Sequence, residues 1–251
     1  LACGSEGKGR LADIEEILRT VRESLSRSQD LAGIAIVVSA GATREPLDPV
    51  RFLSNRSSGR MGVAIAEAAR RRGARVTLLA GHMSVPPPAG LTVVRFGTTA
   101  EYLEVSRKHF EGCHVFIGAA APADYAPAEA APAKVTKAET GAEWTVRLRA
   151  TPDVIAGLAA RKGSRVVVGF AAETHDLLEH AARKLQQKNL DLIVANDVSD
   201  PCSGFEVPTN RVTFLYPDGR AEALPLLRKE EVADALLDRV RAMLPGDVSR
   251  T

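Results

Sequence analysis

The chain has few aromatic residues and almost no excess of charge of either sign. Phenylalanine, tyrosine and tryptophan make up 4% of its 251 residues, and 33 Lys and Arg residues against 31 Asp and Glu residues give a net charge of +2. Proteins that bind nucleic acid usually carry a basic surface, often with aromatic side chains beside it. The composition therefore argues against a nucleic-acid partner.

Cysteine is equally sparse, and long apolar segments are absent. Cys3, Cys113 and Cys202 share no metal-ligand spacing, and an odd, low count is typical of proteins of the reducing cytoplasm. No apolar run reaches the length of a membrane span, and the sequence begins with no secretory signal. We therefore expect a cytoplasmic protein without membrane contact. Because the first residue is Leu1 rather than methionine, we also expect a piece of a longer polypeptide.

Several familiar nucleotide-binding and catalytic motifs are missing as well. Gly41 follows the first predicted strand but begins no GxGxxG motif, and no acidic residue ends the second strand at residues 80–82. Both absences disfavour a nicotinamide dehydrogenase. Neither a Walker A loop nor a GxSxG elbow is present. The five histidines are scattered, and we expect them to have surface or core roles.

Apolar runs and helical patterns alternate from residue 34 onward. Buried strands are predicted over 34–39, 75–80, 92–96, 114–119, 165–170 and 190–195, and helices over 60–72, 99–110, 152–160, 174–188 and 229–244. Continuous apolar runs such as these are typical of strands covered on both faces. The order predicts an α/β fold with a doubly wound, Rossmann-like, mostly parallel sheet.

Other segments depart from this pattern. Residues 144–149 alternate polar and apolar, and residues 211–216 and 220–224 predict a hairpin around Pro217-Asp218-Gly219. They predict an antiparallel extension or a dimer contact. A helix is predicted over 14–25, a linker over 26–32 and a tail over 246–251, so we expect one main domain over residues 33–245. Three arginines at 70–72 close a helix, where positive charge suits the helix dipole.

The most informative segment is the long loop over residues 39–62, SAGATREPLDPVRFLSNRSSGRMG. It lies between a buried strand and a helix, and its prolines and apolar residues argue against disorder. Its polar side chains suit anions and are delivered at a helix N-terminus, where backbone N–H groups also bind anions. These residues are Thr43, Arg44, Arg51, Ser54, Asn55, Arg56, Ser57, Ser58 and Gly59. The loop predicts a pocket for a phosphorylated or carboxylated small molecule.

Four more segments of unusual composition follow predicted strands. They are residues 118–125, the loop around Lys134 and Lys137, residues 169–174 and residues 195–197. Ligands of open α/β sheets bind outside the carboxyl ends of the strands, and small residues there let a ligand approach the backbone. We therefore expect these segments to share one site with the long loop.

The order of these motifs resembles the phosphopantothenoylcysteine synthetase family, the ligase half of the bacterial bifunctional coenzyme A biosynthesis protein. The resemblance covers residues 34–240, from TREPLDPVRFLSNRSSGRMG through ADY, the lysine loop, TPDVI and VGFAAET to KNLDLIVAND. The opening LACGSEGKGRLAD resembles the end of the flavin-dependent decarboxylase that precedes this ligase. Residues 1–32 are thus expected to be a decarboxylase remnant and linker helix, with FMN confined to the missing half and Cys3 idle.

The resemblance implies a reaction in two steps. The carboxylate of 4′-phosphopantothenate attacks the α-phosphorus of CTP and releases pyrophosphate, and the amine of L-cysteine then attacks the acyl-cytidylate and releases CMP. It further implies Mg²⁺ on the phosphates, a homodimer whose contact is made by the antiparallel extension, and a decarboxylase domain as partner in the full-length protein. The choice of CTP over ATP rests on the resemblance alone.

The resemblance also assigns roles to individual residues. Asn55 and Arg51 match positions that hold the intermediate, with Ala120 and Ala121 lining the substrate, and Lys134 matches the lysine of the second step. Nucleotide contacts are expected from Gly118, Ala119, Ala120, Asp124, Lys134, Pro152, Asp153, Val154, Ile155, Phe170, Lys184 and Lys188. The last two are four residues apart, so both can reach one triphosphate.

Three points stay open on the residues themselves. The ligand of Mg²⁺ is one of Asp124, Glu173 and Asp197, and Thr136 interrupts the lysine loop where the family carries further lysines. The first alternative function is a Rossmann enzyme that binds NADP or a nucleotide sugar. The second is a non-catalytic assembly module that docks to a decarboxylase core.

Overall fold

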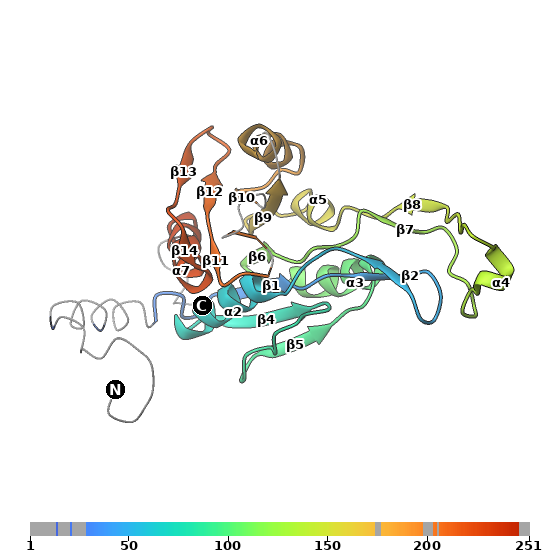
Figure 1. Cartoon of the computed structure of the whole chain (residues 1–251). Helices are drawn as coiled ribbons and strands as arrows, with labels where there is room; N and C mark the ends of the chain where they lie inside the picture. Colours follow the sequence, from blue (N-terminus) through green and yellow to red (C-terminus); the bar gives the residue numbers. More distant parts are fainter. Residues whose placement is uncertain are drawn as a thin grey trace, which may run out of the picture.

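An eight-stranded sheet forms the centre of the protein, in the strand order β13-β12-β10-β9-β6-β1-β4-β5 (Figure 1). The computed structural model describes residues 14, 21, 29–173, 177–197, 203–204 and 206–245. The strands are β1 Ala35–Ala40, β4 Arg75–Ala80, β5 Thr92–Arg95, β6 Val115–Gly118, β9 Val166–Glu173, β10 Leu192–Asp197, β12 Val212–Leu215 and β13 Ala221–Ala223.

The strand pairing confirms the predicted doubly wound topology. All neighbouring pairs from β10 to β5 are parallel, whereas β12 and β13 add an antiparallel extension next to β10. From β1 the chain moves outward to β4 and β5, and then returns to β6 on the other side of β1. A reversal of this kind opens a crevice at the carboxyl ends of the two central strands, where open α/β sheets bind ligands.

Helices cover both faces of the sheet because successive strand residues point to opposite sides. Ile36 and Val38 of β1 belong to the core shared with α2 (Arg60–Arg71) and α7 (Lys229–Met243). Val37 belongs to the opposite core, shared with α3, α5 and α6. These three helices span Thr99–Phe110, Val154–Ala159 and Leu177–Gln187. Within the described ranges, every helix is too short or too polar to span a membrane.

Most predicted elements are confirmed, with shifts at their ends that have local causes. α5 begins at Val154 rather than residue 152, because the Asp153 side chain accepts a hydrogen bond from the Ala156 N–H and caps the helix. β9 and β10 run on to residues 173 and 197, further than their apolar runs indicate. The predicted helix over 14–25 and tail over 246–251 lie outside the described residues, apart from helical positions 14 and 21.

The long loop after β1 is partly a hairpin, which corrects the expectation of a continuous loop. Arg44–Pro46 (β2) pairs with Phe52–Ser54 (β3). Residues 144–149 also differ from expectation, since only Leu148–Ala150 (β8) is a strand, and it pairs with Tyr125–Pro127 (β7). Each of these strands has three residues, too few for a clear period in the sequence.

These strands and the short helix α4 (Lys137–Thr140) form a projection that we call the arm (Figure 1). Thr136, the residue that interrupts the lysine loop, starts α4 with a capping box that includes Glu139. A second small ribbon pairs Thr209–Asn210 (β11) with Leu227–Arg228 (β14) just before α7. The arm thus leaves the body of the sheet, whereas the second ribbon leads into α7.

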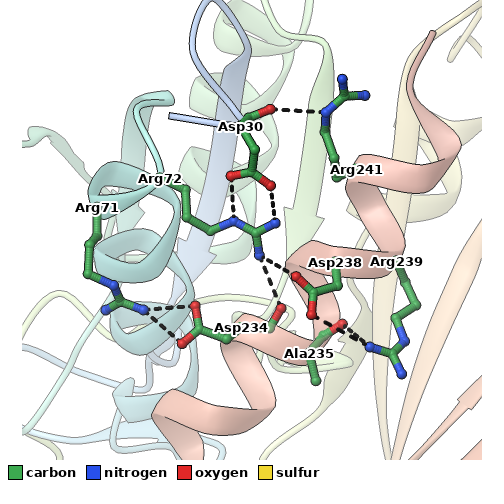
Figure 2. A network of polar contacts seen from close by, with 8 residues as sticks. All are labelled: Asp30, Arg71, Arg72, Asp234, Ala235, Asp238, Arg239 and Arg241. Carbon is green, nitrogen blue, oxygen red and sulfur yellow. Dashed lines mark hydrogen bonds and ion pairs between the residues drawn. The ribbon is translucent and has the colours of Figure 1, made fainter. Parts of the chain in front are cut away.

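A buried arginine fastens α2 to α7 (Figure 2). Arg72 ends α2 with 2% of its side chain exposed, forms an ion pair with Asp30, and lies 2.9 Å from Oδ1 of Asp238. Burial by itself would lower the pKa of Arg72, but the two carboxylates outweigh it and the pKa is raised. Next to it, Nη2 of Arg71 donates to both carboxylate oxygens of Asp234 at 2.8 Å. The arginine cluster therefore does more than suit the helix dipole.

We predict that Arg72→Ala destabilises the protein by about 3 kcal/mol, because removing one member of a buried ion-pair network leaves its partners without compensation. Arg70→Ala is the matched control, since Arg70 pairs with Glu67 on the exposed surface of the same helix. It is expected to cost less than about 1 kcal/mol. Urea denaturation of the three proteins measures both values, and equal losses for the two variants would contradict the role of Arg72.

Candidate active site

A cleft of about 480 Å³ lies at the carboxyl ends of β1 and β6. Loops from both halves of the sheet form its walls, so residues far apart in the sequence meet there. It is lined by residues 55–62, Tyr102, residues 118–124, residues 151–155, residues 170–172, Lys184, Lys188, Asn196, Gly204, Asn210 and Lys229. The end of the long loop and three of the four segments after the strands thus share one site, as the sequence predicts, but the loop around Lys134 and Lys137 does not line it.

Buried hydroxyl groups of Ser39 and Thr43 hold the backbone N–H groups of the loop after β6. Tyr102 donates to Oγ of Ser39 at 2.8 Å, and the same oxygen accepts the N–H of Ala120 at 3.2 Å. Burial raises the pKa of Tyr102 to about 12, which keeps its phenol protonated as a donor. Further along, the Ala123 N–H donates to Oγ1 of Thr43 at 2.9 Å. These contacts present the small side chains and backbone of the loop to the cleft.

Thr151 and Asn55 donate hydrogen bonds to the carbonyl groups of this loop. Oγ1 of Thr151 donates to the Ala123 carbonyl at 2.6 Å, and the Thr151 N–H donates to the Asp124 carbonyl at 2.9 Å. Nδ2 of Asn55 donates to the Pro122 carbonyl at 2.8 Å. Asn55 therefore lies within the cleft with its amide directed at the loop after β6. It does not cap α2, because Gly59 occupies that position.

The N-terminus of α2 faces the cleft with its backbone donors available. Gly59 is the N-cap with φ +78°, a conformation suited to glycine, and no side chain of the described residues caps the helix. A methyl group at Gly62 would come within 2.5 Å of Cβ of Ala40, so glycine lets the helix approach β1 closely. The free N–H groups of the first turn are suited to an anion.

Two lysines reach the cleft from the opposite face of the sheet. Lys184 belongs to α6 and Lys188 follows its last residue, and both line the cleft. Nζ of Lys188 lies 2.9 Å from Oδ2 of Asp153, the N-cap of α5. A polyphosphate in the cleft would therefore compete with the Asp153 carboxylate for this charge.

Four lining residues lie outside every segment that the sequence singled out: Tyr102, Gly204, Asn210 and Lys229. The amides of Asn196 and Asn210 meet at Oγ of Ser203, at 2.9 and 2.8 Å. Lys229 is the first residue of α7, where a positive charge opposes the helix dipole. A lysine at the start of a predicted helix is the one feature of the sequence that could have indicated Lys229 as a binding residue.

Arg51 and Lys134 lie outside this cleft. They line a separate hollow of about 520 Å³ on the arm, together with Trp144. The Arg51 guanidinium lies 4.4 Å from the centre of the Trp144 ring, pairs with the Asp48 carboxylate and donates to the Val135 carbonyl. In this arrangement neither predicted catalytic cation touches the cleft of its own chain.

The sequence profile of the DNA/pantothenate metabolism flavoprotein C-terminal domain family matches residues 31–244. The chain belongs to this family.

Individual relatives agree with the family match. The coenzyme A biosynthesis bifunctional protein CoaBC of Escherichia coli K12 is 46% identical over 241 residues, which cover 95% of this chain and 59% of the relative. CoaBC of Bacillus subtilis is 40% identical over 246 residues, which cover 97% and 60%. The chain thus spans about three fifths of the length of these curated relatives. A crystal structure of the C-terminal domain of CoaBC superposes with a TM-score of 0.74 at 38% identity, over 88% of this chain and 100% of the other.

The binding residues predicted from the sequence divide into those that line the cleft and those that do not. The cleft brings together Asn55, Gly118, Ala119, Ala120, Ala121, Asp124, Pro152, Asp153, Val154, Ile155, Phe170, Lys184 and Lys188. It does not include Arg51 or Lys134. Of the three carboxylates considered for a metal, Asp124 lines the cleft, while the side chains of Glu173 and Asp197 lie outside the described ones. Among described residues no three His, Cys, Asp or Glu side chains form a metal cluster.

We predict that the contribution of Asp48 to the stability of the protein falls as the pH falls below the pKa of an unfolded aspartate. Its burial would raise its pKa, but hydrogen bonds from the Arg51 side chain and from three backbone N–H groups outweigh burial and hold the pKa well below its usual range. A lowered carboxyl pKa contributes stability that is complete above about pH 5 and is lost as the pH falls below the unfolded value of about 4. Asp48→Asn is therefore expected to cost more stability at pH 6 than at pH 3.

Urea denaturation of the wild type and the variant at both pH values measures this difference. Glu104→Gln is the matched control, because Glu104 is an exposed carboxylate on α3. It is expected to change the free energy of unfolding by less than about 0.5 kcal/mol. A cost of Asp48→Asn that does not depend on pH would contradict the proposed source of its stabilisation.

Proposed function

We propose that this chain is the ligase part of a bifunctional coenzyme A biosynthesis protein, acting in the cytoplasm. It joins 4′-phosphopantothenate and L-cysteine at the expense of CTP and forms 4′-phosphopantothenoylcysteine, CMP and pyrophosphate. The family membership and the CoaBC relatives support this assignment. The observation that carries it is the single cleft that unites Asn55, the loop after β6 and the lysines of α6.

The first step needs positive charge and donors around the phosphates. The substrate carboxylate attacks the α-phosphorus of CTP, and both reactants are anions that repel each other unless the site compensates their charge. Lys184 and Lys188 on one side and the free N–H groups of α2 on the other supply that compensation. The backbone of residues 118–121 can accept the nucleotide closely, because their side chains are small.

Mg²⁺ fits this cleft as an ion held mainly by the substrate. Asp124 is an exposed carboxylate in the lining, and Mg²⁺ commonly binds one or two protein carboxylates together with phosphate oxygens and water. When bound, the ion would neutralise charge on the phosphates. We propose Asp124 as its protein ligand; FMN would serve only the decarboxylase half of the full-length protein.

The second step needs a donor at the acyl carbonyl. When the cysteine amine attacks the acyl-cytidylate, negative charge develops on the carbonyl oxygen, and a fixed amide N–H stabilises it. Asn55 offers such an amide within the cleft, where it now donates to the Pro122 carbonyl. A substrate carbonyl that took the place of the Pro122 oxygen would receive the same donor.

Arg51 and Lys134 can take part only if the arm meets a cleft other than the one beside it. We propose a homodimer in which the arm makes the contact, in place of the β12–β13 extension, because Arg51 and Lys134 lie on the arm. Tyr125 and Leu148 on the β7–β8 ribbon and Val50 and Phe52 on the β2–β3 hairpin are exposed apolar side chains, which suits a surface that a second copy covers. The arm of one copy would then bring its two cations toward the cleft of the other.

Two alternatives are less well supported. A Rossmann enzyme for NADP or a nucleotide sugar would need a glycine motif after β1, which this chain lacks; Gly59 is the N-cap of α2 and Gly62 lies in its first turn. A non-catalytic assembly module explains neither the aligned lysines nor the directed amide of Asn55. Stabilisation by NADPH without stabilisation by CTP would favour the first alternative, and CTP binding without turnover would favour the second.

The central prediction concerns Asn55→Ala. With 4′-phosphopantothenate, Mg²⁺, CTP and cysteine, the wild type is expected to release pyrophosphate and CMP and to form a cysteine adduct. Loss of one donor at a developing oxyanion lowers the rate about 10²- to 10³-fold, so the variant should form pyrophosphate and acyl-cytidylate but convert the latter slowly. Mass spectrometry of quenched reactions measures the intermediate and the product.

Gln186→Ala is the matched control. Its amide also donates to a proline carbonyl, that of Pro217 at 3.2 Å, but it lies on the exposed surface of α6 and does not line the cleft. It should leave turnover unchanged. If the wild type released no pyrophosphate from any nucleoside triphosphate, the ligase assignment would be wrong, and the assembly module would replace it.

For the dimer, we predict that Leu148→Glu converts the protein to a monomer and removes turnover, because a charge is introduced into the contact. Leu148 is 44% exposed on β8, and the control Leu226→Glu changes a leucine that is 39% exposed away from the arm. Light scattering during size-exclusion chromatography gives the mass of each variant. A Leu148→Glu protein that stays dimeric and active would exclude this part of the arm from the contact.

A further inference from the structure

The side of the cleft opposite α6 contains a buried lysine that no role assigned above uses. Lys229 lines the cleft with only 3% of the residue exposed. Its Nζ donates to the Gly204 carbonyl at 2.7 Å and to the Val207 carbonyl. An ammonium group has three N–H donors, so one remains for a ligand in the cleft.

A second cation, Arg60, adds positive charge beside Lys229. Arg60 lines the same part of the cleft as the first residue of α2, as Lys229 is of α7. Each cation therefore lies at the positive end of a helix dipole. Burial first, and then the charge of Arg60, lower the pKa of Lys229 to about 8. Two cations and two helix N-termini thus meet at one place.

The described carboxylates offset the charge of Lys229 only in part. None of them forms an ion pair with Lys229 or Arg60; Glu230 acts to raise the pKa of Lys229, but it is exposed, pairs with Arg228 and is outweighed by burial and Arg60. A buried charge without an ion pair costs free energy, and buried titratable groups of this kind cluster at functional sites, where a ligand can supply the opposite charge. An anion with several charges is the ligand that this end of the cleft fits.

We propose that Lys229 binds the pyrophosphate portion of the nucleotide, with Arg60 and the N-terminus of α2 beside it. This inference rests on the proposed function, since it names the part of CTP that this end of the cleft receives. The proposal also assigns the cations of the cleft to two different parts of the nucleotide. Lys184 and Lys188 reach the cleft from the other face of the sheet and remain for the rest of the nucleotide.

The proposed role follows from the charges that move in the first step. The carboxylate oxygen forms a bond to the α-phosphorus, and the bond from the α-phosphorus to the bridging oxygen breaks. That oxygen leaves with the electron pair as part of pyrophosphate, so negative charge grows on the leaving group. A protonated lysine with one free N–H beside it lowers the energy of the departing anion.

A purely structural role for Lys229 makes a different prediction. In that case it only ties the carbonyls of Gly204 and Val207 to the start of α7, and an uncharged donor would serve equally well. Lys229→Gln separates the two roles, because an amide keeps two N–H donors for those carbonyls but has no charge. Lys229→Met removes both and is the second variant in case the first does not fold.

The test measures binding of inorganic pyrophosphate and of CMP to the full chain by isothermal titration calorimetry. Loss of one charge-assisted hydrogen bond should weaken pyrophosphate binding about 10- to 100-fold, while CMP binding changes less than about twofold. Lys162→Gln is the matched control, since Lys162 also donates to a carbonyl, that of Asn189, but does not line the cleft. It should bind both ligands as the wild type does.

The outcomes separate this inference from the proposed function. Equal weakening of pyrophosphate and CMP in Lys229→Gln, or no weakening of either, would assign Lys229 a structural role and overturn the inference. A wild type that binds no pyrophosphate would do the same. Failure of the wild type to turn over CTP and 4′-phosphopantothenate, with pyrophosphate binding still dependent on Lys229, would instead reject the ligase and leave the anion site in place.

Discussion

The buried guanidinium of Arg72 is the interaction on which the arrangement of the cleft depends. It ends α2, binds Asp30 before the sheet begins and binds Asp238 within α7, so three segments meet at one charge (Figure 2). Both helices start at the cleft, one at Arg60 and the other at Lys229. Fixing the two helices at Arg72 therefore fixes how their N-termini lie relative to each other at the site. An ion-pair network at the far end of α2 from the cleft thus helps to set the geometry of the proposed anion site.

The loop after β6 offers its backbone, rather than long side chains, to the cleft. Small side chains at 118–121 let a ligand approach the backbone closely, and such a loop cannot hold itself in place by packing of its side chains. Hydroxyl groups of Ser39, Thr43 and Thr151 hold it instead, each from a different segment. A hydrogen bond to a buried backbone group is costly to lose, so these contacts define one conformation. The cleft is thus preorganised by residues that have no part in the proposed chemistry.

The sequence predicted the parts of this protein that have a long period or a long motif. Strands such as β4 and helices such as α3 agree with their apolar patterns residue by residue. It did not predict the β2–β3 hairpin, whose turn depends on Asp48 accepting N–H groups from Val50 and Arg51, a local contact without a period. Motif resemblance found the residues of the loop after β6 and of α6, but it could not place Arg51 and Lys134 in space. Lys229 was not predicted as a binding residue, because a single lysine at the start of a helix belongs to no recognisable motif.

The two ends of the cleft differ in charge, so an asymmetric anionic ligand would bind in one orientation. Lysines of α6 approach from one face of the sheet, and Arg60 and Lys229 approach from the other, with Asn55 and the loop after β6 between them. Lys188 already has a carboxylate partner in Asp153, whereas none of the described carboxylates forms an ion pair with Lys229. A ligand with unequal charge at its two ends would therefore gain more by placing its more highly charged end beside Lys229. For a nucleoside triphosphate that end is the one that leaves, so binding and departure of pyrophosphate would be governed by the same buried charge.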